Sequence, residues 1–196
     1  PDEGAVFRRD WFRRWRPGEL PLRFDRTVMS WDMTFKDTAG ADFVVGQVWG
    51  MKGAQSFLLD QVRKRMGFVD TCQAFRELAA RWPEAREKLV EDTANGPAVI
   101  DTLKKKVPGI IPVKPEGSKR ARAHAVTAYL EAGNVFFPAE ASWVGDMEHE
   151  LLSFPSGAHD DQVDALTQAL RRLYVRPSFR IAPSVMTALG PAGGAF

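Results

Sequence analysis

Three aspartates, Asp160, Asp161 and Asp164, fall within five positions of the sequence. They lie where a run with helical periodicity begins. The apolar stripe of that run consists of Val163, Leu166, Leu170 and Leu173. On a helix, Asp164 shares a face with Asp161 through i,i+3 spacing and with Asp160 through i,i+4 spacing. Carboxylates this close repel one another unless a cation lies among them. Taken alone, acidic residues in a first helical turn have an ordinary explanation, because they complement the helix dipole.

Two further carboxylates lie at the ends of strands that the sequence predicts to be buried. The segment Thr27–Met33 is apolar on both faces, which is typical of a central strand, and Asp32 lies toward its end. A shorter strand over residues 88–91 ends in Glu91. A carboxylate at the end of a buried strand costs free energy unless it is paired or bound to a metal. Asp32 and Glu91 are therefore candidate partners for the aspartates of the last helix.

The elements that must position these residues predict a mixed α/β sheet. Three strands separated by short turns, over residues 27–33, 43–49 and 56–60, predict an antiparallel meander. Alternating elements follow: helices over 70–81, 97–106, 119–132, 143–152 and from the aspartates to 174, strands over 88–91 and 109–113, and a short extended piece over 134–138. We expect the first strand to be central and the fourth to run parallel to it. Right-handed crossovers then bring Asp32 beside Glu91, and the last helix adds Asp161 and Asp164.

Composition limits the class of protein. The 196 residues are most simply one domain, and 44% hydrophobic with 27% charged residues is ordinary for a soluble globular protein. The single Cys72 excludes an internal disulfide and a thiolate metal cluster. We find no stretch of about 18 apolar residues that would span a membrane. The net charge of only +2 means that a nucleic-acid surface would have to be local.

We expect three segments. Residues 1–26 are rich in Arg and Trp and broken by prolines, and we interpret them as an irregular or partly extended lead-in. Within them, the aromatic residues of Phe7–Trp15 are expected to pack on the core rather than stack on nucleic acid. Residues 27–176 form the folded domain. Residues 177–196 hold many Gly, Pro and Ala residues without a period, which predicts a flexible C-terminal tail.

An all-carboxylate site has a definite chemistry. It would consist of Asp32, Glu91 and Asp161, with Asp160 and Asp164 nearby. Hard oxygen ligands select Mg²⁺ or Mn²⁺ over softer metals. Such a site suits two ions about 3.5–4 Å apart, which clamp the attacking and leaving oxygens of a phosphoryl displacement. One ion would generate hydroxide from water, and the other would stabilise the departing 3′ oxygen. The adjoining His159 is interpreted as a contact at the helix start rather than as a catalytic acid or base.

Several short motifs follow one another between residues 30 and 166. They are Ser30-Trp31-Asp32, Val90 to Pro97, Lys119 with Arg122, Gly133 to Pro138, Glu150 to Pro155, and His159 to Ala165. In this order they resemble the C-terminal nuclease domain of the large terminase subunit of tailed bacteriophages, in the RNase H-like superfamily. A lone DDxxD motif would be weak, whereas the ordered set is specific and covers about two-thirds of the chain.

The resemblance implies an RNase H-like mixed five-stranded sheet, with three antiparallel strands and then two parallel ones, flanked by helices. It implies an endonuclease that cuts concatemeric double-stranded phage DNA during packaging, with two Mg²⁺ or Mn²⁺ ions. The main catalytic ligands carried over are Asp32, Glu91 and Asp161. Asp160 and Asp164 are carried over as adjacent metal ligands, because family members differ in which acids engage the ions. Lys119 and Arg122 are carried over as DNA contacts.

The partners implied are double-stranded DNA, an ATPase domain, the small terminase subunit and the portal of the procapsid, in the host bacterial cytoplasm and away from membranes. The sequence contains no GxxxxGK[ST] phosphate-binding loop. We therefore expect cleavage without ATPase activity in this chain. Because the chain starts without Met, we expect residues 1–26 to be the end of a linker from a missing ATPase domain.

Three alternatives stay open on the residues alone. Another RNase H-like nuclease, such as a Holliday-junction resolvase or a transposase, would use the same chemistry on a different substrate. A non-catalytic DNA-binding or assembly module would use the acids for a structural ion. A calcium loop built on Asp32, Asp37 and Asp42 is disfavoured, since the spacing is five residues rather than two.

Overall fold

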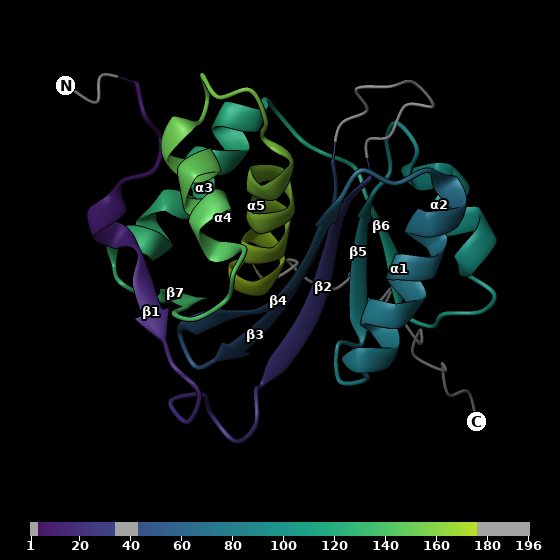
Figure 1. Cartoon of the computed structure of the whole chain (residues 1–196), viewed down its shortest axis with the longest axis horizontal. Helices are drawn as coiled ribbons and strands as arrows, with labels where there is room; N and C mark the ends of the chain where they lie inside the picture. The colour runs from purple at the N-terminus through teal and green to yellow at the C-terminus, as the bar shows by residue number, and fades with distance from the viewer. Residues whose placement is uncertain (1–3, 34–42, 176–196) are drawn as a thin grey trace, which may run out of the picture.

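A seven-stranded mixed sheet runs through the molecule and carries helices on both faces (Figure 1). The computed structural model describes residues 4–33 and 43–175. The strand order is β1-β7-β4-β3-β2-β5-β6. The strands are β1 (Arg13–Trp15), β2 (Arg26–Met33), β3 (Val44–Lys52), β4 (Gln55–Lys64), β5 (Glu87–Glu91), β6 (Ile110–Val113) and β7 (Val135–Pro138). The helices are α1 (Phe68–Arg81), α2 (Gly96–Leu103), α3 (Lys119–Glu131), α4 (Val144–Ser153) and α5 (Asp161–Tyr174), with a 3-10 turn η1 (Arg9–Trp11).

Strand β2 lies near the middle of the sheet, as its apolar sequence predicts. It is antiparallel to β3 and parallel to β5, and every residue after Arg26 is buried. Strand β3 is antiparallel to β4, and β6 runs parallel to β5. The predicted meander and the parallel placement of the fourth strand are therefore confirmed. Strands buried on both faces lose their alternation of polar and apolar residues, which is why this central strand could be recognised.

The predicted number of five strands is too low. Strand β7, expected only as a short extended piece, pairs parallel with β4 through Ser56↔Val135. Strand β1, which falls within the expected lead-in, pairs parallel with the outer side of β7. Strands of three and four residues are too short to show a period in the sequence. Their pairing also depends on partners far away along the chain, which no local pattern reveals.

The N-terminal segment packs on the domain. Phe7 is buried against Phe154, with ring centroids 6.2 Å apart, and Phe12 meets the edge of Phe137 at 5.4 Å. The expectation that these aromatic residues pack on the core is confirmed. The described part of the lead-in thus contributes to the domain, while its origin as a linker stays a prediction. The expected tail over residues 177–196 lies outside the described residues.

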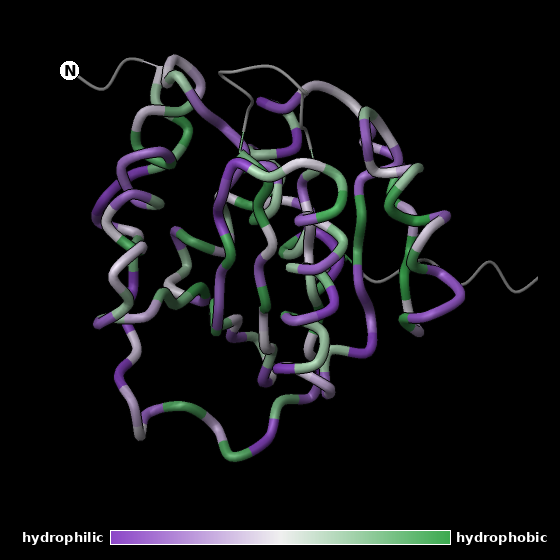
Figure 2. The backbone as a smooth tube through the Cα atoms, turned by 45° about the vertical axis from the view of Figure 1, so that its right-hand side comes forward, coloured by the Kyte–Doolittle hydropathy of each residue, from purple (hydrophilic) through white to green (hydrophobic). Residues whose placement is uncertain are grey.

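Two hydrophobic clusters lie on opposite faces of the sheet. Helices α3, α4 and α5 cover one cluster, and α1 and α2 cover the other. Figure 2 shows apolar residues recurring along the strands between these helices. Of the two faces, the one carrying α5 is relevant here, because α5 crosses β2 and β3 and its first turn holds the aspartates. Within the described residues, no helix is both long and apolar enough to span a membrane.

A charged brace holds the C-terminal end of α5. Arg26 donates to Glu87 at 3.2 Å and to the carbonyl of Leu173 at 3.3 Å, while Arg172 Nε donates to Glu87 at 2.6 Å. Burial opposes the charge of Glu87, but the hydrogen bond from Arg172 and the nearby guanidinium groups outweigh it, so the pKa of Glu87 is lowered. The brace therefore ties α5 to the starts of β2 and β5.

We expect Glu87→Gln to lower the free energy of unfolding by about 1 kcal/mol at neutral pH. A lowered pKa in the folded state stabilises the fold above the unfolded pKa, and this contribution is lost as pH falls through the folded value. The difference between wild type and variant should therefore shrink on acidification. Urea unfolding at several pH values measures it, with exposed Glu84→Gln as the control. Equal stability of wild type and Glu87→Gln at neutral pH would contradict the brace.

Candidate active site

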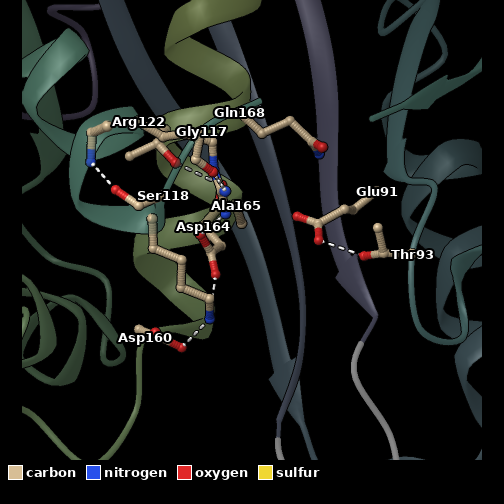
Figure 3. Close-up of polar contacts among 12 residues, drawn as sticks. Glu91, Thr93, Gly117, Ser118, Arg122, Asp160, Asp164, Ala165 and Gln168 are labelled. Carbon is tan, nitrogen blue, oxygen red and sulfur yellow. Dashed lines mark hydrogen bonds and ion pairs between the residues drawn. The ribbon is translucent and has the colours of Figure 1, made fainter. Parts of the chain in front are cut away.

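The ends of β2 and β5 bring two predicted acids to one edge of the sheet. Trp31 pairs with Val90 in the parallel register, so the next residues, Asp32 and Glu91, follow side by side. Asp32 is only 7% exposed. In Figure 3 the Glu91 carboxylate points from β5 toward Asp164 on α5. The sheet thus positions the first two carboxylates, and α5, packed on one face of the sheet, lies beside them.

Asp32 is buried among three other acids, and this surrounding changes its pKa. Burial raises that pKa well above its ordinary value, and the neighbouring charges of Asp164, Asp161 and Glu91 raise it further. Asp161 and Asp164 are each 6% exposed in the first turn of α5. Four carboxylates from three elements therefore act on one another. The structure brings them together as the sequence suggested, while their catalytic roles stay predictions.

Two basic side chains of α3 meet the aspartates of α5. Lys119 Nζ lies 2.7 Å from both Asp160 Oδ1 and Asp164 Oδ2. Arg122 Nη2 donates to Asp164 Oδ1 at 2.8 Å (Figure 3). Burial opposes the charge of Lys119, but its hydrogen bonds to Asp160 and Asp164 outweigh burial and raise its pKa. Lys119 is therefore a permanent cation within the acidic cluster.

The start of α3 explains why both cations point this way. Ser118 caps the helix by accepting a hydrogen bond from the Ala121 amide at 3.1 Å. Lys119 and Arg122 then share one face through i,i+3 spacing. Arg122 is only 11% exposed at its side chain and also donates to the carbonyl of Gly117 at 3.2 Å. Both predicted DNA contacts thus lie beside the acids, and contact with DNA remains a prediction for each.

The loop after β5 holds Glu91 closely. Thr93 Oγ1 donates to Glu91 Oε1 at 2.6 Å. A Cβ atom added at Gly96 would collide with the Glu91 carbonyl oxygen, so α2 can begin this close only with glycine there. Ala94 adopts a positive φ of 49° within the same turn. The turn between β5 and α2 is therefore tight, and it fixes the backbone that carries Glu91.

The donor atoms fit a hard divalent cation by chemistry, because they are carboxylate oxygens without sulfur. Within residues 4–33 and 43–175, no three His, Cys, Asp or Glu side chains are grouped as a ready metal cage. In this arrangement Lys119 and Arg122 balance the charge of Asp164 instead. The donor atoms therefore match a hard divalent cation in kind, while the charge of Asp164 is balanced by the two basic side chains in this arrangement.

A chain of buried hydrogen bonds reaches the first turn of α5, and sequence reasoning missed it. Trp49 Nε1 donates to Gln47 at 2.9 Å, Gln47 to Gln61 at 2.8 Å, and Gln61 to Gln162 at 2.9 Å. Gln162 then donates through its side chain and its backbone amide to Glu150, both at 2.6 Å. Because Gln162 lies between Asp161 and Asp164, these buried hydrogen bonds anchor the turn of α5 that carries both aspartates.

Arg63 completes this network by donating to Glu150 Oε2 at 3.1 Å. The Arg63 guanidinium also stacks on Phe43 at 3.7 Å. Glu150 belongs to one of the sequence motifs, but the motif predicted no role for it. The available signal was Gln47 within the apolar run of β3, together with Gln61 on the neighbouring strand β4. Buried polar side chains need partners, so such glutamines indicate a network.

A second contact joins α5 to β2 beside Asp32. Ser30 Oγ donates to the carbonyl of Ala165 at 2.7 Å, and Gln168 Nε2 donates to Ser30 Oγ at 2.9 Å. Separately, His159 Nδ1 lies 4.0 Å from Asp161, and its ring meets the edge of Phe43 at 5.1 Å. His159 therefore lies at the helix start, as expected.

Comparison with known proteins agrees with this geometry. The family model described as the terminase RNaseH-like domain matches residues 29–173. The large terminase nuclease of thermophilic phage G20c with bound magnesium is 18% identical, with a TM-score of 0.64 over 88% of this chain and 99% of that chain. Its cobalt-bound form is 16% identical, with a TM-score of 0.67 over the same shares.

The large terminase of a second thermophilic bacteriophage is 12% identical, with a TM-score of 0.64, and the match covers 85% of this chain and 43% of that one. This chain thus spans less than half the length of that second terminase. A search of curated proteins finds no match. At these identities the structural likeness concerns the fold alone, whereas the family model confirms the predicted RNase H-like class. Because the family model covers most of the sequence, the chain belongs to the terminase RNaseH-like domain family.

Proposed function

We propose that this chain is a divalent-metal-dependent endonuclease that hydrolyses concatemeric double-stranded phage DNA during genome packaging. The observation that carries the proposal is the placement of Asp32 and Glu91 at the ends of neighbouring parallel strands, beside the first turn of α5 with Asp161 and Asp164. Membership of the terminase RNaseH-like domain family supports it. A transposase or junction resolvase would share the acids, but the family favours a packaging nuclease.

We propose two ions, either Mg²⁺ or Mn²⁺. Asp32, Glu91 and Asp161 would hold them, with Asp160 and Asp164 as adjacent ligands. When bound, the ions supply a hydroxide nucleophile and stabilise the charge of the leaving 3′ oxygen. Structures of the G20c nuclease contain magnesium or cobalt, which supports a divalent ion here. The all-oxygen donor set favours the harder ions for this chain.

Other residues of this chain hold the acids in position and balance negative charge at the site. The hydrogen bonds of Ser30 and Gln162 hold α5 against β2 and α4, and so keep the acids of its first turn close to Asp32. Lys119 and Arg122 are the cations closest to Asp164, which makes them the best placed to contact a phosphate next to the scissile bond. Contacts of this kind position DNA without reading its sequence.

We also propose the wider setting. The chain would act together with an ATPase domain, the small terminase subunit and the portal of the procapsid, in the host bacterial cytoplasm. The match to the second large terminase supports a larger protein, because that terminase is more than twice as long as its matched region. Translocation would belong to the ATPase domain, and ATP hydrolysis is not expected from this chain.

We expect supercoiled plasmid to be nicked and linearised in the presence of Mg²⁺ or Mn²⁺, and cleavage to stop when EDTA removes the ion. Asp161→Asn should lose activity, whereas Asp101→Asn, an exposed acid on α2, should keep it. A gel assay measures both. Linear duplex should be cut at least as fast as a four-way junction or an RNA–DNA hybrid. The proposal is wrong if no divalent ion supports cleavage, or if cleavage survives EDTA.

A further inference from the structure

A pocket of about 470 Å³ opens beside the candidate active site, between β5, β6 and α5. Glu91 and Asp164 form part of its wall, so it is continuous with the acidic cluster. Lys114 and Arg171 lie on the same wall, and neither belongs to the predicted site. The pocket therefore extends the site toward the end of β6 and the second half of α5.

The cations of this pocket differ in how their charge is balanced. Arg122 is held by Asp164 at 2.8 Å, and Arg172 is held by Glu87 at 2.6 Å. Arg171 has a weaker ion pair, 3.8 Å from Glu116, whose side chain is 86% exposed. Lys114 lines the pocket and is exposed. Water strongly screens an exposed ion pair at this distance. Lys114 and Arg171 therefore lose little free energy when an anion replaces the water, or Glu116, beside them.

Apolar side chains form much of the remaining wall of the pocket, beside Glu116 and Gln168. They include Ile111, Val113, Pro115 and Val175, and Val175 is 56% exposed. Cations beside apolar surface match a nucleic-acid strand, which offers phosphates to basic side chains and sugar or base faces to apolar ones. A small inorganic anion would use only the first of these features. A strand that passes the acids at one end of the pocket would use both.

We propose that this pocket receives the DNA strand on one side of the scissile phosphate, with Lys114 and Arg171 contacting its phosphates. This inference rests on the proposed nuclease function and adds a binding subsite to it. It predicts that affinity for DNA depends on two cations that are separate from the carboxylates. Equilibrium binding without divalent ions therefore tests the subsite independently of cleavage.

The experiment compares wild type with Lys114→Ala/Arg171→Ala on a fluorescein-labelled 30-base-pair duplex, by anisotropy in EDTA over a range of salt concentrations. Each lost phosphate contact reduces the salt slope of binding by about one, so the double variant should lose about two. Its affinity should fall on the order of tenfold at moderate salt. The charge-retaining Arg171→Lys should keep most of the slope.

The matched control is Arg76→Ala/Lys105→Ala, which removes one exposed cation from α1 and one from the turn after α2, on the opposite face of the sheet. It should bind as wild type does. The subsite is refuted if the Lys114/Arg171 variant keeps the wild-type affinity and salt slope, if the control loses as much, or if wild type binds no duplex. A wild type that binds duplex but cleaves none with any divalent ion refutes the nuclease function instead, and the slopes still decide on the subsite.

Discussion

Replacing Asp32 with asparagine should abolish DNA cleavage and, without divalent ions, stabilise the fold at neutral pH. Cleavage is lost because the variant removes a ligand from the centre of the acidic cluster. Bound metal ions stabilise the transition state of phosphoryl transfer by several kcal/mol, so the cleavage rate should fall on the order of a thousandfold or more. The fold gains because Asp32 is a buried carboxylate that faces three other acids.

The sign of the stability effect follows from the pKa of Asp32. Burial first, and then Asp164, Asp161 and Glu91, raise this pKa above its ordinary value in the folded state. The folded protein is therefore penalised as the pH rises through the interval between the unfolded and folded pKa values. The penalty is absent at acidic pH, where Asp32 is protonated in both states. Asparagine resembles the protonated form and never incurs the penalty.

Thermal unfolding in EDTA at several pH values measures this effect. Asp32→Asn should unfold at a higher temperature than wild type at neutral pH, and the gap should close on acidification. Added Mg²⁺ should stabilise wild type more than the variant, because only wild type retains the full ligand set. The exposed Asp101→Asn serves as the control. A variant less stable than wild type at neutral pH, or one that still cleaves, contradicts the assignment.

Glu150→Ala is expected to have the largest effect on stability. Glu150 accepts hydrogen bonds from Arg63 and, twice, from Gln162 in a buried place. Its loss leaves a charge and two donors without their acceptor, which costs about 3–5 kcal/mol in buried pairs. Because Gln162 lies between Asp161 and Asp164, the first turn of α5 should also move. Cleavage by the folded fraction should fall about tenfold or more.

Chemical unfolding and cleavage rates, taken well below the unfolding temperature, separate the two effects. Glu150→Gln keeps the size and one of the two acceptor oxygens, so it should recover part of the stability and part of the activity. Exposed Glu131→Ala at the end of α3 should change neither. If Glu150→Ala unfolds like wild type, the network does not anchor α5. If it loses stability but cleaves at the full rate, the network supports the fold without positioning the acids.

The sequence predicted the centre of the fold and the main acids because their signals are local. An apolar strand that ends in Asp32 is recognisable, and so is a helix that opens with Asp161 and Asp164. The strand β1 was missed because three residues show no period, and its partner β7 lies more than a hundred residues away. The ion pairs of Lys119 could not be predicted either. They depend on how α3 packs against α5, and side-chain partners across a core leave no pattern in a single sequence.

The order of strands also bears on mechanical load. The N-terminal segment enters the sheet at β1, and three strands, β7, β4 and β3, separate β1 from the strand that carries Asp32. Tension applied at residue 4 would act first on the packing of Phe7 against Phe154, and then on the three-residue pairing between β1 and β7. That short edge pair would open before the long β3–β4 ladder sheared. A pull from that side could therefore peel away the border of the sheet while the acids stayed aligned.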